Sequence, residues 1–173
     1  MASTHGRRQL RLRGWNYSWP ATYSITISTI KSADLLGEVL RGEMVPNGIG
    51  QTVAECWRWL GSHFAHVVLD EWTLMPTHMH GILVLSTPAA QQETPVAGEC
   101  ERLKPLGQVI GAFKTRSTKE VNRLRATPGA VLWQRDYWER IIHDEYELSR
   151  AREYIRTNAA NYRPRIYRDV MPE

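Results

Sequence analysis

The 173-residue sequence contains no long hydrophobic run and only two cysteines. No apolar stretch is long enough to cross a bilayer, and the first residues lack the apolar segment of a signal peptide. Cys56 and Cys100 match no spacing that is typical of a metal or redox site. We therefore expect a cytoplasmic protein with two free thiols, whose length suits one domain with a sizeable core.

Basic residues are in slight excess, with a formal net charge of +4, and the arginines are unevenly distributed. They gather in an N-terminal arm (residues 1–20), in a candidate helix (106–124) and toward a C-terminal tail (163–173). Because the planar guanidinium suits phosphate, this pattern favours a nucleic-acid partner, although a solvated surface with intrahelical ion pairs explains the charge equally well. The candidate contacts to a nucleic-acid backbone are Arg11, Arg13, Lys114, Arg116, Arg150 and Arg156.

Aromatic residues in the arm offer a second kind of nucleic-acid contact. Trp15, Tyr17 and Trp19 lie among its basic residues, where they can stack on bases or pack against the domain. The residues Trp57, Trp59 and Trp72 are expected in the core.

Hydrophobic periodicity predicts an α+β fold with a central, mainly antiparallel sheet. The expected elements are strands at 23–30, 67–75, 78–85 and 131–134, an irregular extended hairpin at 36–45, and helices at 49–64, 106–124 and 145–158. The polar, proline-containing residues 86–104 are expected to form a mobile insertion. With one apolar face per element, this order suggests helices packed on one face of the sheet.

Two histidines, separated by one residue, open the strand expected at 78–85. Successive side chains of a strand point to opposite faces, so His78 and His80 share one face and Met79 lies on the other. Two imidazoles on one rigid strand form half of a site for a divalent metal. The alternative is a pair of polar residues on a solvated strand face.

A tyrosine and an asparagine lie four residues apart in the last expected helix, at Tyr154 and Asn158. One helical turn puts both side chains on the same face. A tyrosine hydroxyl can act as a nucleophile, and an asparagine oxygen can bind a metal or orient a phosphate. A divalent metal held by His78, His80 and Asn158 would polarise a phosphate for attack. A packed tyrosine and a helix-terminal asparagine are the structural alternatives.

The two motifs together resemble those of a known protein family. His78-Met79-His80 resembles the histidine–hydrophobe–histidine (HUH) motif, and the run from Tyr154 to Asn158 resembles the tyrosine-plus-amide helix of single-tyrosine HUH transposases, in the HUH endonuclease superfamily. Residues 133–145 resemble the segment before that helix. The asparagine, in place of a glutamine, and the chain length are most similar to the REP-associated tyrosine transposases. The resemblance covers about residues 15–162.

The resemblance implies a ferredoxin-like or RRM-like sheet with helices packed on it, in a transposase-like domain at residues 21–162. It also implies a metal-dependent, DNA-binding enzyme of DNA transposition and recombination, which nicks and joins single-stranded, hairpin-bearing repeat DNA near the nucleoid. His78, His80 and Asn158 would bind Mg²⁺ or Mn²⁺, and Tyr154 would form a 5′-phosphotyrosine intermediate. Because such transposases include monomers and dimers, the resemblance leaves both a monomer and a homodimer open, and it implies no membrane partner.

One residue departs from the family pattern, since Ala159 follows Asn158 where many REP-associated relatives have proline. Proline would stop the helix, whereas alanine lets it continue toward Asn161. The departure removes no reactive group. Two other functions stay open from the sequence. One is a domesticated, non-catalytic protein that binds DNA hairpins, and the other is a replication-initiator or relaxase-type nickase, which we expect to be larger.

Overall fold

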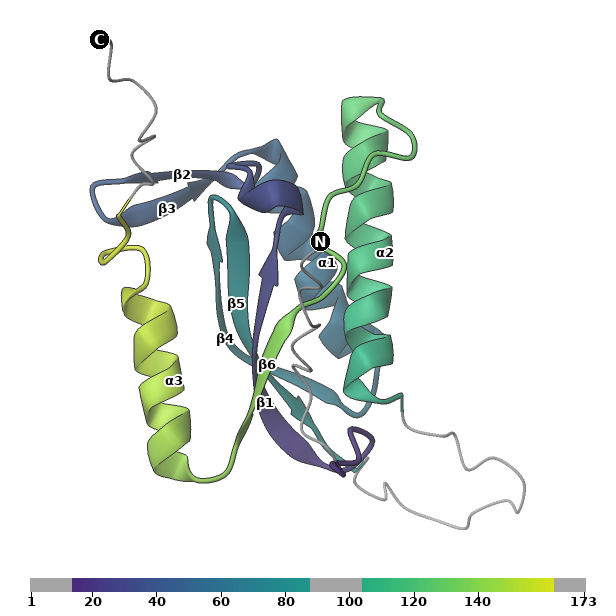
Figure 1. Ribbon diagram of the computed structural model, residues 1–173, viewed down its shortest axis with the longest axis vertical. Coiled ribbons are helices and arrows are strands. Elements are labelled where there is room, and N and C mark those ends of the chain that lie inside the picture. Colours follow the sequence, from purple (N-terminus) through teal and green to yellow (C-terminus); the bar gives the residue numbers. More distant parts are fainter. Residues whose placement is uncertain (1–13, 88–103, 164–173) are drawn as a thin grey trace, which may run out of the picture.

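The computed structural model describes residues 14–87 and 104–163. In these residues the chain forms β1 (Ala21–Ser28), the 3-10 turn η1 (Ile30–Ser32), β2 (Gly37–Leu40), β3 (Glu43–Pro46), α1 (Gly48–His63), β4 (Val67–Met75), β5 (His78–Leu85), α2 (Leu106–Arg125), β6 (Trp138–Ile142) and α3 (Glu145–Thr157). The fold is α+β, as predicted (Figure 1). None of the helices in these ranges combines the length and the hydrophobicity that crossing a bilayer requires.

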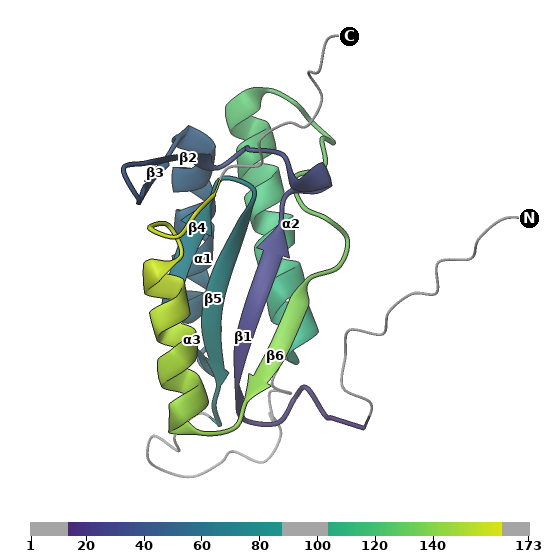
Figure 2. The same ribbon diagram turned by 60° about the vertical axis from the view of Figure 1, so that its left-hand side comes forward.

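Four strands form the central sheet in the order β4-β5-β1-β6, and every neighbouring pair is antiparallel (Figure 2). Apart from the β2–β3 hairpin and the final helix α3, the order of elements along the chain is strand, helix, two strands, helix, strand. This is the ferredoxin-like arrangement. The predicted fold class is therefore confirmed. The hairpin expected at residues 36–45 is formed by β2 and β3, which pair outside the central sheet.

The main hydrophobic core lies between the sheet and the helices α1 and α2. Strand β1 alternates, so Tyr23, Ile25 and Ile27 are buried in this core while the hydroxyl residues between them face the other way. Trp57 of α1 is fully buried, and a Cβ atom at Gly81 of β5 would lie only 2.6 Å from its indole ring. The lack of a side chain at Gly81 therefore lets α1 pack directly against β5.

Helix α3 packs on the opposite face of the sheet from α1 and α2 (Figure 1). Its apolar contact is small, because Ile155 packs with Ile82 and Ile142 and only Leu148 and Ala151 join them. The expectation that the helices all cover one face is therefore wrong. Periodicity shows that a face is buried, but it does not say which element buries it.

The fourth strand of the sheet is β6 at residues 138–142, so the strand expected at 131–134 is wrong. In the described structure, residues 131–134 contribute one isolated bridge, between Trp133 and Thr29. Leu132 and Trp133 are consecutive and both buried in the main core, which the alternating faces of a regular strand do not allow. Short apolar runs of this kind are ambiguous in sequence.

The expected N-terminal arm, insertion and C-terminal tail lie largely outside the described residues. Those outside are 1–13, with Arg11 and Arg13, 88–103, with Cys100, and 164–173. The described part of the arm packs on the domain. The Trp15 indole N–H donates to the Tyr23 hydroxyl at 3.1 Å, and the rings of Tyr17 and Tyr23 stack with centroids 5.9 Å apart.

Candidate functional site

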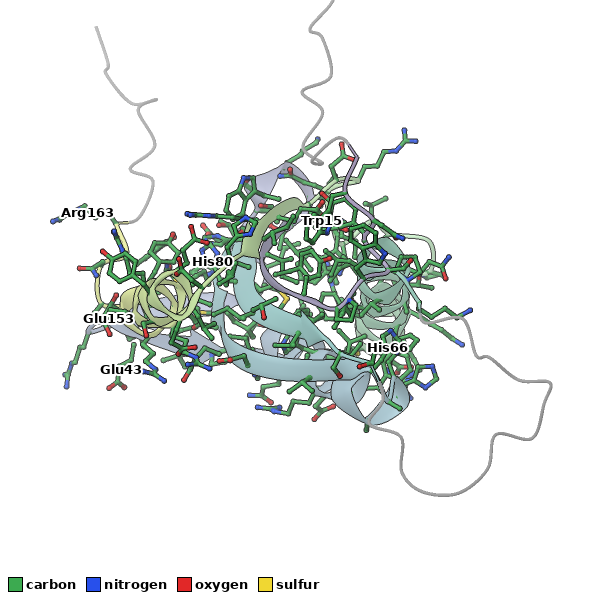
Figure 3. The ribbon with its side chains drawn as sticks, turned by 90° about the horizontal axis from the view of Figure 1, so that it is seen from below. Trp15, Glu43, His66, His80, Glu153 and Arg163 are labelled. Carbon is green, nitrogen blue, oxygen red and sulfur yellow. The ribbon has the colours of Figure 1, made fainter. Side chains whose placement is uncertain are left out.

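His78 and His80 project from β5 on the face that α3 covers, and their rings meet edge to face. The Nε2 atoms of the two rings are 3.0 Å apart, so the two side chains share a face as predicted. β5 lies inside the sheet between β4 and β1, and hydrogen bonds on both sides hold the backbone that carries the rings. Figure 3 shows His80 between α3 and the sheet.

A threonine hydroxyl lies against the other nitrogen of each ring. Thr26 Oγ1 is 2.8 Å from His80 Nδ1, and Thr77 Oγ1 is 2.8 Å from His78 Nδ1. The register of the sheet creates the first contact, because Thr26 is the direct cross-strand neighbour of His80. When each Nδ1 carries the proton and donates it to its threonine, both Nε2 atoms can act as metal ligands.

Burial keeps His80 in its neutral form. The residue is 9% exposed, and the loss of solvation, with a smaller contribution from His78, lowers its pKa from 6.5 to about 4. Neutral imidazole is the form that binds a metal. His80 is therefore in the ligand form across the physiological pH range.

The distance between the two Nε2 atoms suits a shared metal ion. Two nitrogens that each lie about 2.1 Å from one ion, at about a right angle, are about 3.0 Å apart. The histidine pair and its threonine partners therefore fit a divalent metal. Among residues 14–87 and 104–163, no group of three or more His, Cys, Asp or Glu side chains is placed to hold one. An amide oxygen such as that of Asn158 is a chemically suitable further donor.

Tyr154 packs on His80 from α3. The centroids of the two rings are 5.2 Å apart and their planes meet at 77°. Tyr154 is 57% exposed, so much of its side chain stays open to solvent. The last helix therefore folds back against the histidine strand and brings the predicted nucleophile into contact with His80, one of the predicted metal ligands.

Two arginines of α3 hold the helix against β4. Arg152 makes a two-point contact with Asp70, from Nε to Oδ1 at 2.9 Å and from a terminal nitrogen to Oδ2 at 2.6 Å. Arg156, one turn later, donates to the carboxylate of Glu71. Asp70 and Glu71 lie at a bulge in β4, where the local twist re-aims side chains. These pairs fix how α3 lies on the sheet and thereby position Tyr154.

Asn158 lies one helical turn after Tyr154, directly after the end of α3. Its backbone is still helical, so it keeps to the same side of the helix as Tyr154, and it is half-buried. The Asn161 N–H donates to the Thr157 carbonyl at 3.1 Å, so the chain continues in a helical turn past Ala159. The described contacts join His78, His80 and Tyr154, and Asn158 lies one turn farther along.

A groove of about 690 Å³ lies between α3 and the strands β1 and β6, with His80 and Tyr154 in its wall. Its lining combines aromatic rings, hydroxyls and charges. Trp138 and Arg140 come from β6, and Tyr146 and Arg150 come from α3. Aromatic rings of this kind are the surfaces on which the bases of single-stranded nucleic acid stack.

The protein has a relative of similar length in Haemophilus influenzae. This uncharacterized protein is 32% identical to it over 162 residues, which are 91% of the present chain and 90% of the relative. The chain belongs to the same family as this protein. No family model matches the sequence.

A solved structure of a REP-associated tyrosine transposase, bound to a REP hairpin, has the same fold. The TM-score is 0.56 at 17% sequence identity, over 86% of this chain and 72% of that chain. A candidate transposase of Deinococcus radiodurans matches with a TM-score of 0.48 at 15% identity, over 84% of this chain and 95% of that chain. The first comparison confirms the resemblance to the REP-associated transposases at the level of the fold.

The predicted nucleic-acid contacts lie on different sides of the molecule. Arg150 lines the groove, and its guanidinium lies 5.9 Å from the centroid of the Tyr146 ring. Arg156 is on the same helix but pairs with Glu71. Arg116 belongs to α2, across the sheet from the groove.

Lys114, also on α2, makes its contacts within the fold. Its ammonium donates to the carbonyls of Gln134, Arg135 and Asp136 at 2.9, 3.2 and 3.0 Å. Burial lowers the pKa of Lys114 to about 8, against the opposing effect of the Asp136 carboxylate. Lys114 therefore holds the loop that leads into β6.

Three residues of the site, Thr26, Trp138 and Arg140, were not singled out from the sequence. Alternation in β1 places Thr26 on the face away from the core, but it does not give the register that sets Thr26 beside His80. Trp138 and Arg140 lie in the segment 133–145, and the resemblance of this segment to the transposase family is the signal that marks them.

Proposed function

We propose that the protein is a single-strand DNA endonuclease and strand transferase that acts through a covalent bond to Tyr154. The observation that carries this proposal is the packing of Tyr154 on His80, with ring centroids 5.2 Å apart. It puts a solvent-open tyrosine beside two imidazoles, in the wall of a groove with arginines and aromatic rings. The fold shared with a transposase solved with a REP hairpin supports hairpin-containing repeat DNA as the substrate.

In the proposed reaction the Tyr154 hydroxyl oxygen attacks the phosphorus of one phosphodiester, and the bond to the 3′ oxygen breaks. The phenol loses its proton and the 3′ oxygen gains one, so the products are a 5′-phosphotyrosine and a strand with a 3′ hydroxyl. Because one phosphate ester replaces another, the 3′ hydroxyl of a second strand can reverse the step and join new ends. Arg150, in the same groove, is placed to bind a backbone phosphate.

The residues proposed to hold Mg²⁺ or Mn²⁺ are His78, His80 and Asn158. When bound, a divalent ion supplies Lewis-acid polarisation of the phosphate and offsets its negative charge. The hydroxyls of Thr26 and Thr77 hold the two rings so that both Nε2 atoms face one position. Ion pairs to Asp70 and Glu71 hold α3, and therefore the nucleophile, against β4, which is the neighbour of the histidine strand in the sheet.

A labelled single-stranded oligonucleotide that carries a hairpin tests this function. The protein is incubated with it in Mg²⁺, in Mn²⁺ or with a chelator, and the products are separated under denaturing conditions. We expect a covalent protein–DNA adduct with metal, lost with chelator and lost in Tyr154→Phe. Tyr146→Phe is the matched control and should keep the adduct, because Tyr146 lies on the same helix, lines the same groove and is 69% exposed.

The outcomes separate the candidate functions. An adduct that persists in Tyr154→Phe would place the nucleophile at another residue. Binding of the hairpin without an adduct under every metal condition would instead identify a non-catalytic DNA-hairpin-binding protein.

A further inference from the structure

Strand β6 places an exposed tryptophan in the same row of the sheet as the site histidine. Thr26 of β1 pairs with His80 on one side and with Trp138 on the other. Directly opposed residues of antiparallel strands lie on the same face, so Trp138 projects on the face that carries His80. Neighbouring strands lie about 4.8 Å apart, which puts the backbone at Trp138 about 10 Å from the backbone at His80.

Trp138 presents aromatic surface to the groove. It is 47% exposed and lines the groove across from α3, with Tyr146 and Tyr154 contributed by the helix. Ile141 and Ile142 of the same strand pack in the main core and in the small cluster under α3, but Trp138 belongs to neither. The half-exposed indole therefore adds aromatic surface to the groove and contributes little to the packing of the fold.

The charges of the groove do not favour phosphate strongly. Arg140 and Arg150 line it, but so do the carboxylates of Asp144 and Glu147, and Arg140 is paired with Glu147 at 2.5 Å. Two positive and two negative side chains give no net attraction for a polyanion. A strand that enters this groove therefore depends on aromatic and hydroxyl contacts, of which the indole is the largest.

We infer that Trp138 is a base-stacking residue, which holds an unpaired nucleotide next to the scissile phosphate on the β6 side of Tyr154. This inference rests on the proposed function for the identity of the ligand as DNA. A distance of about 10 Å between the two backbone positions is within reach of a nucleotide or two of extended strand. The bases of a duplex are covered by their stacked neighbours, so this contact selects single-stranded DNA over the double-stranded form.

Single-stranded oligonucleotides of mixed sequence, each with one 2-aminopurine at a different position, test the inference. Binding is measured in Tyr154→Phe, where no cleavage competes, through the quenching of 2-aminopurine fluorescence by a stacked ring. Adding Trp138→Ala should weaken binding roughly five- to 150-fold and abolish quenching at one position. Adding Trp138→Phe should retain most of the affinity and most of the quenching. Val68→Ala is the control and should change neither the affinity nor the quenching, since Val68 is an apolar side chain of β4 that is 53% exposed but does not line the groove.

Several results would overturn the inference. Unchanged affinity and quenching in Trp138→Ala would do so, as would an equal loss of affinity for the same sequence in double-stranded form. If Trp138→Ala does not fold, Trp138→Leu replaces it, because leucine keeps apolar bulk but offers no ring, and it should also abolish the quenching. The adduct assay is separate. Stacking at Trp138 without any adduct would reject the proposed enzyme and retain this subsite, whereas an adduct without stacking would do the reverse.

Discussion

Each histidine of the pair has one nitrogen turned toward its partner ring and one turned toward a threonine hydroxyl. For His80 the hydroxyl belongs to Thr26, on the neighbouring strand. A residue that accepts the Nδ1 proton fixes both the tautomer and the orientation of the ring. We therefore predict that Thr26→Val lowers the affinity for Mn²⁺ about 10- to 100-fold, measured by calorimetric titration, because the nearly isosteric valine removes the acceptor.

Thr22→Val is the matched control for this prediction. Thr22 lies on the same strand and the same face as Thr26, but it pairs with Val84 and Ile142 in place of a histidine. Its replacement should leave the Mn²⁺ affinity unchanged. Equal affinities in both variants would show that the hydroxyl of Thr26 does not orient His80.

The sequence predicts the candidate site residues whose chemistry is unusual at their spacing. Strand alternation puts His78 and His80 on one face, as in the structure, whereas Tyr154 is marked by the family resemblance together with an amide one turn on. Thr26 could not be found, because one threonine among alternating hydroxyl residues becomes a partner of His80 only through strand register. The sequence predicts Lys114 as a nucleic-acid contact and not as a structural residue, because the loop whose carbonyls it binds has no periodic pattern.

Among the elements, α3 depends on ion pairs for its place on the sheet. The hydrogen bonds from Arg152 lower the pKa of Asp70 below its ordinary value of 3.8. A carboxylate with a lowered folded-state pKa contributes stability that is fully present above the unfolded pKa and is lost as the pH falls through the folded one. We predict that Asp70→Asn lowers Tm by a few degrees at neutral pH, and that the difference from the wild type shrinks on acidification below about pH 3.8 and disappears once the pH lies below the lowered folded-state pKa.

Thermal melts of both proteins across this pH range measure the effect. Glu153→Gln is the matched control, because Glu153 lies on the outer side of the same helix (Figure 3). It should leave Tm almost unchanged at every pH. A Tm difference for Asp70→Asn that persists at low pH would mean that the asparagine acts through packing and not through the lost charge.

The predicted helices and strands agree with the structure where the hydrophobic pattern is long, and the wrong prediction concerns a short segment. Residues 131–134 are apolar enough for a strand, yet Leu132 and Trp133 both turn into the main core. β6 alternates more clearly, with Glu139 and Ile141 buried and Arg140 exposed between them. Because two of these residues are charged, the sequence does not show the apolar alternation that is typical of a strand. Only the pairing with β1 identifies it as the edge of the sheet.

At the scale of the whole molecule, the two faces of the sheet are covered very unequally. α1 and α2 share the main core, which includes the large side chains of Trp57 and Phe113, whereas α3 covers its face with a small isoleucine cluster and three ion pairs to the sheet. Segments with few buried apolar contacts open at lower free energy than the global unfolding of the domain. The sequence of α3 carries fewer aliphatic side chains than that of α2, but it does not show which face of the sheet the helix covers.

We therefore predict that the amides of α3 exchange with deuterium before those of α1, in an opening that leaves the main core folded. Ile155→Ala should speed exchange in α3 alone, because losing a buried isoleucine costs about 2–5 kcal/mol of the contact that α3 depends on. Leu60→Ala, in the main core, should speed exchange in α1 and α3 together, because it lowers global stability. Exchange at one common rate in both helices of the wild-type protein would contradict the prediction, since it would show that Tyr154 leaves His80 only when the whole domain unfolds.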